Sequence, residues 1–421
     1  MVRQRHPAGG RRDFRQPRHH RQAGGEIHAQ GRHLLTLHPF DEYERRLAPY
    51  AARSAQSRGR ACPEPEHPYR SPFQRDRDRI IHSSAFRRLE SKTQVYTHLY
   101  QEGDQFRKRL THTLEVAQIG RSVSRALGLN EDLTEAIALV HDIGHAPFGH
   151  KGQDILHELM EGGGGFEHNT QALRIVCIIE NRYPEFKGLN LTYELREAIA
   201  KKGHRMAEPL KAEFETHPHS SLEGQVVDIS DPITYSTHDL DDGIVNGTIT
   251  PEMLKECELW NEGVAWTKAK YPALREKLLR YQVVRYIINE QVTDLINQTQ
   301  KNIEGAGVAT IDQVRVFPQK LAGFSPAMRE KHNGLKKFLQ KNMYDHYRVK
   351  RMEAHARKII TELFNIFLDQ PELFPPGVRG HFDEEKKSGN EKRIVCDYIA
   401  GMTDSFALNE YEKLFGHSPK I

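Results

Sequence analysis

The segment LVHDIGHAPFGH, residues 139–150, constrains the fold of this chain more than any other feature. Four polar, ionisable side chains follow an apolar helical run there: His141, Asp142, His145 and His150. Burying imidazoles beside a carboxylate costs free energy unless each polar group finds a partner. A metal ion or a phosphate would be such a partner, and the rest of the chain decides between these and an ordinary buried cluster.

Helical patterns flank that segment on both sides. Residues 109–128 carry an apolar stripe at helical spacing, formed by Val116, Ile119, Val123 and Ala126. The next helix begins at the capping residue Asn130 and must end before Pro147. Residues 224–244 predict a further helix, although Pro232 should kink or restart it.

The rest of the chain favours an all-α fold. Residues 276–299, 354–368 and 393–415 are strongly helical, and the best short strand candidate is 305–317. We therefore predict a helical body with at most a short β-hairpin. We expect three parts, namely a disordered basic leader and arm over 1–66, a core over 67–260, and a helical C-terminal part over 261–421 packed on that core.

The bulk composition narrows the class of protein. The 421 residues are 37% hydrophobic and 28% charged, which is enough to bury a core. No stretch is long and apolar enough to predict a transmembrane helix, so we expect no membrane partner. The four cysteines form no CxxC pair, which argues against a zinc ribbon or a disulfide framework and favours the cytoplasm.

The first 33 residues differ from the rest, with eight arginines against Asp13 and Glu26 and few apolar side chains. Such a segment cannot offset its ordering entropy, so we expect it to be disordered. It also lacks the apolar run of a signal peptide. A basic arm can bind nucleic acid, but a solvated tail is the simpler expectation.

Two further segments supply candidate metal ligands. His112 shares the apolar stripe of its helix and therefore points inward. Neighbours such as His141 and Asp142 diverge by about 100° on a helix, so they reach one centre only if it lies between them. Asp231 follows an apolar stretch and completes a set of two imidazoles and two carboxylates. That set, with positions left for water, suits a hydrolytic ion such as Mg²⁺, Mn²⁺ or Fe²⁺ better than structural zinc.

The order H…HD…D resembles the HD superfamily of metal-dependent phosphohydrolases. The surrounding motifs are more specific than the ligands, and they occur in family order: FRRLESKTQVY, KRLTHTLEVAQIGRSVSRALGLN, ALVHDIGHAPFGHKG, GGFEHNTQALRI, QVVDISDPITYSTHDLDDG and CDYIAGMTD. Together they resemble the deoxyguanosine triphosphate triphosphohydrolase-like branch, from about Tyr69 to Phe415. The resemblance implies an HD-domain helical phosphohydrolase fold with additional C-terminal helices.

The resemblance also implies a reaction, in which a dNTP is cleaved between O5′ and the α-phosphorus to a deoxynucleoside and inorganic triphosphate. The implied divalent ion is held by His112, His141, Asp142 and Asp231. We expect Mg²⁺ or Mn²⁺ first, with Fe, Co, Ni and Zn as alternatives. The implied catalytic residues are Asp142, His145 and His168. His145 is the first candidate, and His168 the second, for the acid that protonates the leaving alkoxide.

Five residues are expected to bind the substrate: Gln94, Arg109, His150, Tyr235 and Asp239. Arg109 lies one helical turn before His112, so its guanidinium can reach phosphates beside the metal. His150 matches a position that lines the phosphate pocket. Gln94 and Asp239 match positions that bond the 3′-hydroxyl, and Tyr235 matches the ring beneath the deoxyribose.

Three positions depart from the family pattern. Pro232 replaces an acidic residue, which puts the local helix geometry in doubt. Ser405 stands where arginine is usual, and the change would weaken a subunit or phosphate contact. Gln153 occupies a position that is often acidic. If the acidic group polarises a neighbouring histidine, this enzyme, which has an amide there, would be slower or differently pH-dependent.

Two other functions stay open. One is another HD reaction, such as that of a 5′-nucleotidase, a cyclic-nucleotide phosphodiesterase or a guanosine-tetraphosphate hydrolase. The other is a binder of nucleotides or single-stranded DNA that keeps the fold without catalysis. Besides the dNTP, the partners we consider are an allosteric nucleotide, single-stranded DNA and further copies of the chain. Family members form rings, so we expect a homo-oligomer, with a hexamer as one candidate.

Overall fold

Capping residues and buried apolar stripes decide where the helices of this chain lie. The computed structural model describes residues 39–94, 107–202 and 212–416, and the expected leader lies outside them. Asn130 caps a helix as expected, because its side chain accepts a hydrogen bond from the Leu133 amide. Within the described residues the structure has isolated β-bridges but no strand, so the all-α class is confirmed.

The α-helices, in chain order, are α1 (Pro39–Arg45), α2 (Pro72–Ile81), α3 (Ser84–Arg88), α4 (Arg109–Ala126), α5 (Glu131–Val140), α6 (Gly149–Leu159), α7 (His168–Arg174), α8 (Tyr193–Lys202), α9 (Leu222–Val245), α10 (Pro251–Leu254), α11 (Glu258–Lys270), α12 (Glu276–Ala306), α13 (Ile311–Val316), α14 (Pro326–Leu339), α15 (Tyr347–Asp369), α16 (Pro376–Lys386), α17 (Glu391–Ala400) and α18 (Asp404–Phe415). Single π-helical turns follow α7 and α14, over Ile175–Ile179 and Gln340–Tyr344. None of the described helices is long and apolar enough to cross a membrane.

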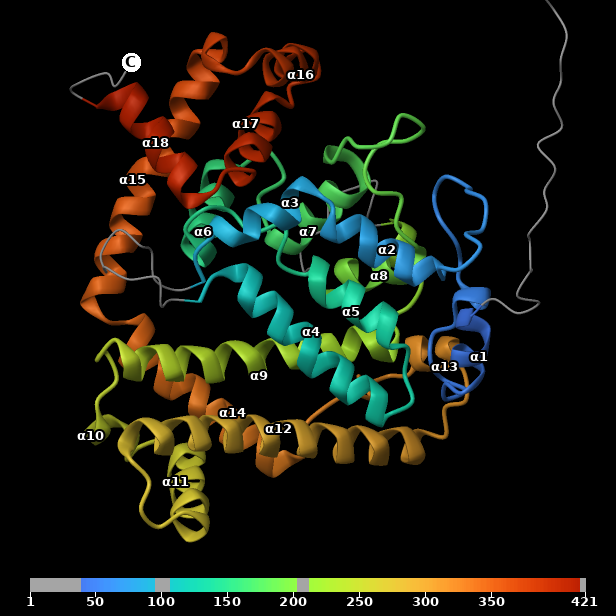
Figure 1. Ribbon diagram of the computed structural model, residues 1–421. Helices are drawn as coiled ribbons and strands as arrows, with labels where there is room; N and C mark the ends of the chain where they lie inside the picture. Colours follow the sequence, from blue (N-terminus) through green and yellow to red (C-terminus); the bar gives the residue numbers. More distant parts are fainter. Residues whose placement is uncertain (1–38, 95–106, 203–211, 417–421) are drawn as a thin grey trace, which may run out of the picture. The chain divides into compact units, whose positions relative to one another are not determined.

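Helix α5 is the centre of the first half of the fold. It packs against α2, α4, α8 and α9 (Figure 1), and every residue from Ala136 to Val140 is buried. The apolar run that precedes the HD pair is therefore enclosed on several sides. Because the chain leaves α5 at Val140, His141 and Asp142 emerge inside the protein and not on its surface.

The later helices pack on these in two groups. Helix α12 lies beside α9 (Figure 1), and Leu240 and Leu295 share one apolar cluster. Helix α15 lies against α6 and, through its C-terminal half, against α17 and α18. Since one apolar cluster crosses residue 260, the expected boundary between a core and a C-terminal part stays a prediction.

The strand expected over 305–317 is wrong, because part of that segment forms α13. Thr310 caps this helix by accepting a hydrogen bond from the Gln313 amide at 3.2 Å. The Gln313 side chain in turn accepts one from the Ala309 amide at 2.6 Å. The first bond caps the helix, and the second ties the residue before the cap to the first turn. Together they outweigh the β-branched residues that suggested a strand.

The described part of the expected arm, residues 39–66, is folded and not disordered. Helix α1 lies within it, and Ala51 and Ala52 are each only 1% exposed. The proline-rich stretch that follows becomes helical as early as Pro72, where Ser71 and Gln74 form a capping box. Proline suits the first turn of a helix, because the amide that it lacks would have no partner inside the helix there.

Two local expectations about helices need correction. Pro232 does not restart its helix, because α9 runs without a break from Leu222 to Val245. Buried neighbours on both sides, among them Val227 and Ile233, hold this helix in place despite the missing proline amide. In α4 the expected stripe residue Ala126 is exposed, and the buried Leu127 follows directly after the helix.

Candidate metal centre and active-site cavity

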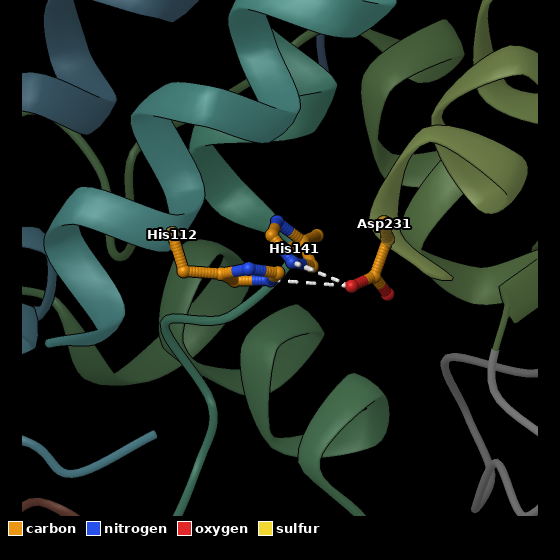
Figure 2. Close-up of side chains that lie close together, drawn as sticks. All are labelled: His112, His141 and Asp231. Carbon is orange, nitrogen blue, oxygen red and sulfur yellow. Dashed lines mark ion pairs between the residues drawn. The ribbon is translucent and has the colours of Figure 1, made fainter. Parts of the chain in front are cut away.

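Three helices bring the candidate metal ligands together. His112 lies in the first turn of α4, His141 and Asp142 follow the last turn of α5, and Asp231 lies midway along α9. Figure 2 shows His112 and His141 turned towards the Asp231 carboxylate. The inward orientation expected for His112, His141 and Asp142 is confirmed, since these side chains are between 1% and 4% exposed.

The distances between the ligand atoms are those of a compact site. The Asp231 Oδ1 atom lies 3.2 Å from His112 Nε2 and 3.8 Å from His141 Nε2. One ligand atom from each of these residues lies within 4.8 Å of the other two. Asp142 borders the same centre, with Oδ1 3.3 Å from His141 Nε2 and Oδ2 3.9 Å from His112 Nε2.

The chemistry of this donor set fits a divalent cation. The His141 Nδ1 atom lies 2.6 Å from the Ala138 carbonyl oxygen, which fixes the proton on Nδ1 and leaves the Nε2 lone pair free to bind a metal. That Nε2 atom is buried and, among the described residues, has no hydrogen-bond partner. Such an unsatisfied atom is costly unless a further partner completes the site.

The protonation states also suit a metal ion. Burial lowers the pKa of His141, so its imidazole is neutral near pH 7. Burial by itself would raise the pKa of Asp142, but His141, Arg109 and His145 outweigh it and hold that pKa well below its usual value. Burial is likewise outweighed at Asp231, whose pKa Lys202 and the two histidines hold well below its usual value. Neutral imidazoles and ionised carboxylates are the forms that bind metals.

A cavity of about 860 Å³ opens over this centre. His141 does not line it but lies 3.3 Å from Asp142, which does. The other residues expected in the site all line it: Gln94, Arg109, His112, Asp142, His145, His150, His168, Asp231, Tyr235 and Asp239. The structure therefore brings together residues that span almost 150 positions of the sequence. Their individual roles stay predictions.

Arg109 is the strongest sign of an anionic ligand in this cavity. It is 1% exposed, and its Nη1 donates to Asp142 Oδ2 at 2.8 Å. Its Nε and Nη2 atoms are buried without a hydrogen-bond partner among the described residues. A buried guanidinium with unused donors is suited to bind a phosphate or carboxylate oxygen.

Three histidines form a second cluster beside the metal centre. The rings of His145 and His168 stack at 4.1 Å between centroids, and the exposed His150 lies 5.2 Å from His145. His145 Nε2 lies 3.1 Å from Asp142 Oδ1. Burial, followed by Arg109 and His168, holds the pKa of His145 well below its usual value.

Gln153 takes part in this second cluster. Its Oε1 atom lies 2.6 Å from His168 Nδ1 and accepts a hydrogen bond from the His168 amide at 2.9 Å. Burial lowers the pKa of His168 to about 3. The position that departs from the acidic family pattern is therefore the one that fixes the orientation of His168.

The residues expected to bind a sugar line the neighbouring part of the cavity. The Gln94 Oε1 atom is buried without a partner among the described residues. Asp239 is 3% exposed, and burial raises its pKa to about 7 although it accepts a hydrogen bond from the Tyr344 hydroxyl. Burial, followed by Asp231 and Asp239, raises the pKa of the half-buried Tyr235.

Several lining residues were missed by the sequence reasoning. Lys202 lies at the end of α8, and its Nζ is 2.7 Å from Asp231 Oδ2. Helices α14 and α15 and the turn between them add Lys336, Gln340, Tyr344, Lys350 and Glu353. The exposed lysines Lys336 and Lys350 look like ordinary surface residues in the sequence. The sequence gives only a weak indication that Lys202 belongs to the site. Lys201 and Lys202 stand at a helix end, where cations usually interact with the helix dipole and not with a ligand.

Two family models of known proteins match parts of this chain. The HD domain family model matches residues 109–235, and the phosphohydrolase-associated domain model matches residues 322–413. Together with the histidine and aspartate cluster, these matches define a phosphohydrolase of the HD type.

Curated relatives identify the family within that class. A deoxyguanosinetriphosphate triphosphohydrolase-like protein of Thiobacillus denitrificans is 48% identical over 374 residues, which cover 88% of this chain and 97% of the relative. Proteins of the same name from an Azoarcus species and from Geobacter sulfurreducens are 49% and 46% identical, with 88% of this chain covered and 96% and 95% of theirs. The chain belongs to the deoxyguanosinetriphosphate triphosphohydrolase-like family.

Proposed function

We propose that this protein is a metal-dependent dNTP triphosphohydrolase, which converts a dNTP such as dGTP and water into a deoxynucleoside and inorganic triphosphate. The observation that carries the proposal is the buried Arg109 guanidinium, which lines the cavity directly beside the candidate metal centre and has two donor atoms without a partner among the described residues. A dNTP carries roughly four negative charges, so a site for it needs cations in addition to a metal ion. Lys202, Lys336 and Lys350 supply further positive charge around the same cavity.

The ligand set His112, His141, Asp142 and Asp231 would hold one divalent cation, with Mg²⁺ or Mn²⁺ the first candidates. Such an ion would supply Lewis-acid activation of the phosphate and of a water molecule. The chain itself must bind the triphosphate, orient the sugar and deliver a proton to the leaving O5′ atom.

Arg109 would hold the triphosphate, because it lies one helical turn before His112 and its Nε and Nη2 atoms bond to none of the described residues. His145 and His168 would act next to the leaving group, where one of them gives its proton to O5′. Both imidazoles are neutral without a ligand. A bound polyanion favours the protonated form of a histidine, so substrate binding would raise these pKa values towards the working range.

The sugar would lie between α9 and the segment around Gln94. The Gln94 Oε1 atom, which has no partner in the described part of the chain, and the Asp239 carboxyl are both suited to bond the 3′-hydroxyl. The Tyr235 ring, one turn after Asp231 on α9, would lie beneath the deoxyribose.

We also propose that the chain forms a homo-oligomer. Light scattering must then show a particle larger than the 48.5 kDa of one chain.

Product analysis tests the function directly. Protein stripped of metal is supplied with Mg²⁺ or Mn²⁺ and each dNTP, and the products are separated and weighed. In water labelled with ¹⁸O, the label must enter triphosphate and not the deoxynucleoside, because the bond between O5′ and the α-phosphorus breaks. Release of phosphate or pyrophosphate instead would favour another HD reaction, and no turnover with any dNTP and metal would favour a binder.

A further inference from the structure

The chain from Ala400 to Asp404, which belongs to the motif CDYIAGMTD, has no part in the proposed reaction. It connects α17 to α18 within the region that matches the phosphohydrolase-associated domain. None of its residues lines the cavity. Its contacts nevertheless reach two segments that do, and both segments carry expected substrate ligands.

Asp404 makes the two central contacts. Its Oδ2 atom accepts a hydrogen bond from the Thr93 amide at 3.0 Å, and its Oδ1 atom accepts one from the Phe148 amide at 3.0 Å. The carboxylate is 7% exposed and stands at the first position of α18. The dipole of that helix favours a negative charge there, so an ionised side chain can hold both amides.

The Phe148 amide belongs to a residue with an unusual backbone conformation, and the Thr93 amide belongs to a closely packed segment. Phe148 has a left-handed conformation with φ 62°, which is costly for a residue other than glycine. Gly149 follows it, and a β-carbon there would lie 3.6 Å from the Gln94 carbonyl oxygen and 3.4 Å from Arg109 Nη2. The Thr93–Gln94 segment and the start of α6 therefore lie directly against each other at the edge of the cavity.

A second link runs alongside the first. The buried Lys92 side chain donates hydrogen bonds to the carbonyl oxygens of His145 and Ala400, the latter at 2.9 Å. Residues 400–404 are thus linked to both of the segments that meet at the cavity. They are linked to one segment through Lys92 and Thr93, and to the other through His145 and Phe148. The expected ligands Gln94 and His150 lie one and two residues beyond the amides that Asp404 binds.

We propose that Asp404 is a positioning residue, which fixes Gln94 and His150 in the cavity by holding the Thr93 and Phe148 amides together. The associated domain would then complete the substrate site without touching the substrate. The catalytic part of this inference rests on the proposed function. The structural part does not, because it concerns two amides whose exchange with solvent can be followed in any state of the protein.

The test compares Asp404→Asn and Asp404→Ala with Glu158→Gln. Glu158 pairs with Arg357 at 2.6 Å and joins α6 to α15, so it spans the same two parts of the chain outside the cavity. Hydrogen exchange of the Thr93 and Phe148 amides should accelerate about tenfold or more in Asp404→Ala. At least one of them should do so in Asp404→Asn, which keeps the shape of the side chain if the alanine variant fails to fold. Glu158→Gln should leave both unchanged.

The kinetic arm separates positioning from general destabilisation. Metal content should stay that of the wild type, while kcat/KM falls about ten- to a hundredfold in Asp404→Asn. The additional loss caused by Gln94→Ala should shrink in that background, whereas the loss caused by Tyr235→Ala on α9 should stay the same. Unchanged exchange of both amides, or a full effect of Gln94→Ala in the variant, would overturn the proposal. A wild type that hydrolyses no dNTP would refute the proposed function and leave the exchange result to decide the structural part.

Discussion

The floor and the far wall of the cavity are built in different ways. We define the floor as Arg109, His112, His141, Asp142 and Asp231, which belong to the region that matches the HD domain. We define the far wall as Lys336, Gln340, Val349, Lys350 and Glu353, which belong to the region that matches the phosphohydrolase-associated domain. Floor residues are mostly buried and contact one another, whereas most of the wall is half-buried or exposed.

From this difference we infer that the floor carries out the reaction and that the wall influences which substrate is bound. The floor holds its charges in fixed geometry before any substrate binds, as the contact between Arg109 and Asp142 at 2.8 Å illustrates. Fixed charges lower the cost of reorganisation during a reaction. The wall mixes apolar and charged side chains whose positions depend on how α14 and α15 pack. We infer that changes to the floor abolish turnover and that changes elsewhere in the cavity alter substrate preference and pH response.

The largest expected effect comes from breaking the floor. Asp142→Ala removes a carboxylate next to both candidate histidine ligands, so metal content should fall to background and turnover by about a thousandfold or more. Elemental analysis of the purified variant, together with dGTP turnover, measures both.

The control for this variant is Asp228→Asn. It also removes a negative charge, one turn before Asp231 on α9, but Asp228 pairs with Lys320 and does not line the cavity. It should keep metal and activity. A full complement of metal in Asp142→Ala would show that the site assignment is wrong.

The next effect concerns the sugar, at the border between floor and wall. A 2′-hydroxyl packed against the Tyr235 ring without a partner costs about 1–3 kcal/mol. Wild type should therefore prefer dGTP over GTP by about ten- to a hundredfold in kcat/KM. Tyr235→Ala should lower activity on dGTP and narrow that ratio.

Tyr286→Ala is a suitable control for this comparison. Tyr286 is half-buried on α12, packs beside Trp266 and does not line the cavity, so its loss should leave the ratio between dGTP and GTP unchanged. If wild type already cleaves both nucleotides equally well, Tyr235 serves only packing.

The contrast between floor and wall also explains which parts of the structure could be predicted from the sequence. Helix α5 and the inward placement of His112, His141 and Asp142 follow from local apolar periodicity, which survives in any tertiary context where that face is buried. The three later helices 276–299, 354–368 and 393–415 were also expected, although the last is two helices that part at Gly401.

The wall could not be predicted in this way. Lys336 and Lys350 face the cavity only because α14 and α15 cross over α9 and α6, and that packing leaves no mark in the periodicity of either segment. The contact of Asp404 with Thr93 spans 311 positions, and no local pattern encodes it. Gln153 was noted as a departure, but only the structure places its side chain against His168.

A third prediction uses Asp239, where the floor helix α9 meets the Tyr344 hydroxyl. Burial raises its pKa to about 7 from the usual value of 3.8. The folded state therefore keeps a proton that the unfolded state loses, so stability is fully present below the unfolded pKa and falls as the pH rises through 7. Between pH 6 and pH 8 the wild type should lose about 1.4 kcal/mol that Asp239→Asn, which cannot ionise, retains.

Denaturant unfolding of both proteins at the two pH values measures this difference. The two curves of stability against pH should converge towards acid and separate towards alkali, with the asparagine variant the more stable at pH 8. Parallel curves would show that Asp239 ionises freely in the folded protein, and its neutral form would then play no part in binding a sugar hydroxyl.

The smallest expected effect is a change of pH profile at Gln153. A carboxylate in place of its amide would face His168 Nδ1, now 2.6 Å from Oε1, and favour the protonated imidazole. An acid must be protonated to act, so its activity is lost as the pH rises through its pKa, and a higher pKa moves this loss to higher pH. If His168 protonates the leaving O5′ atom, Gln153→Glu should raise turnover about two- to fivefold near pH 8 and shift the alkaline limb of the pH profile to higher pH.

Gln118→Glu is the control for this variant. It adds the same charge on the exposed face of α4 and should leave the profile unchanged. An unchanged profile in Gln153→Glu would exclude His168 as the acid and leave that role to His145, whose Nε2 already contacts Asp142 on the floor.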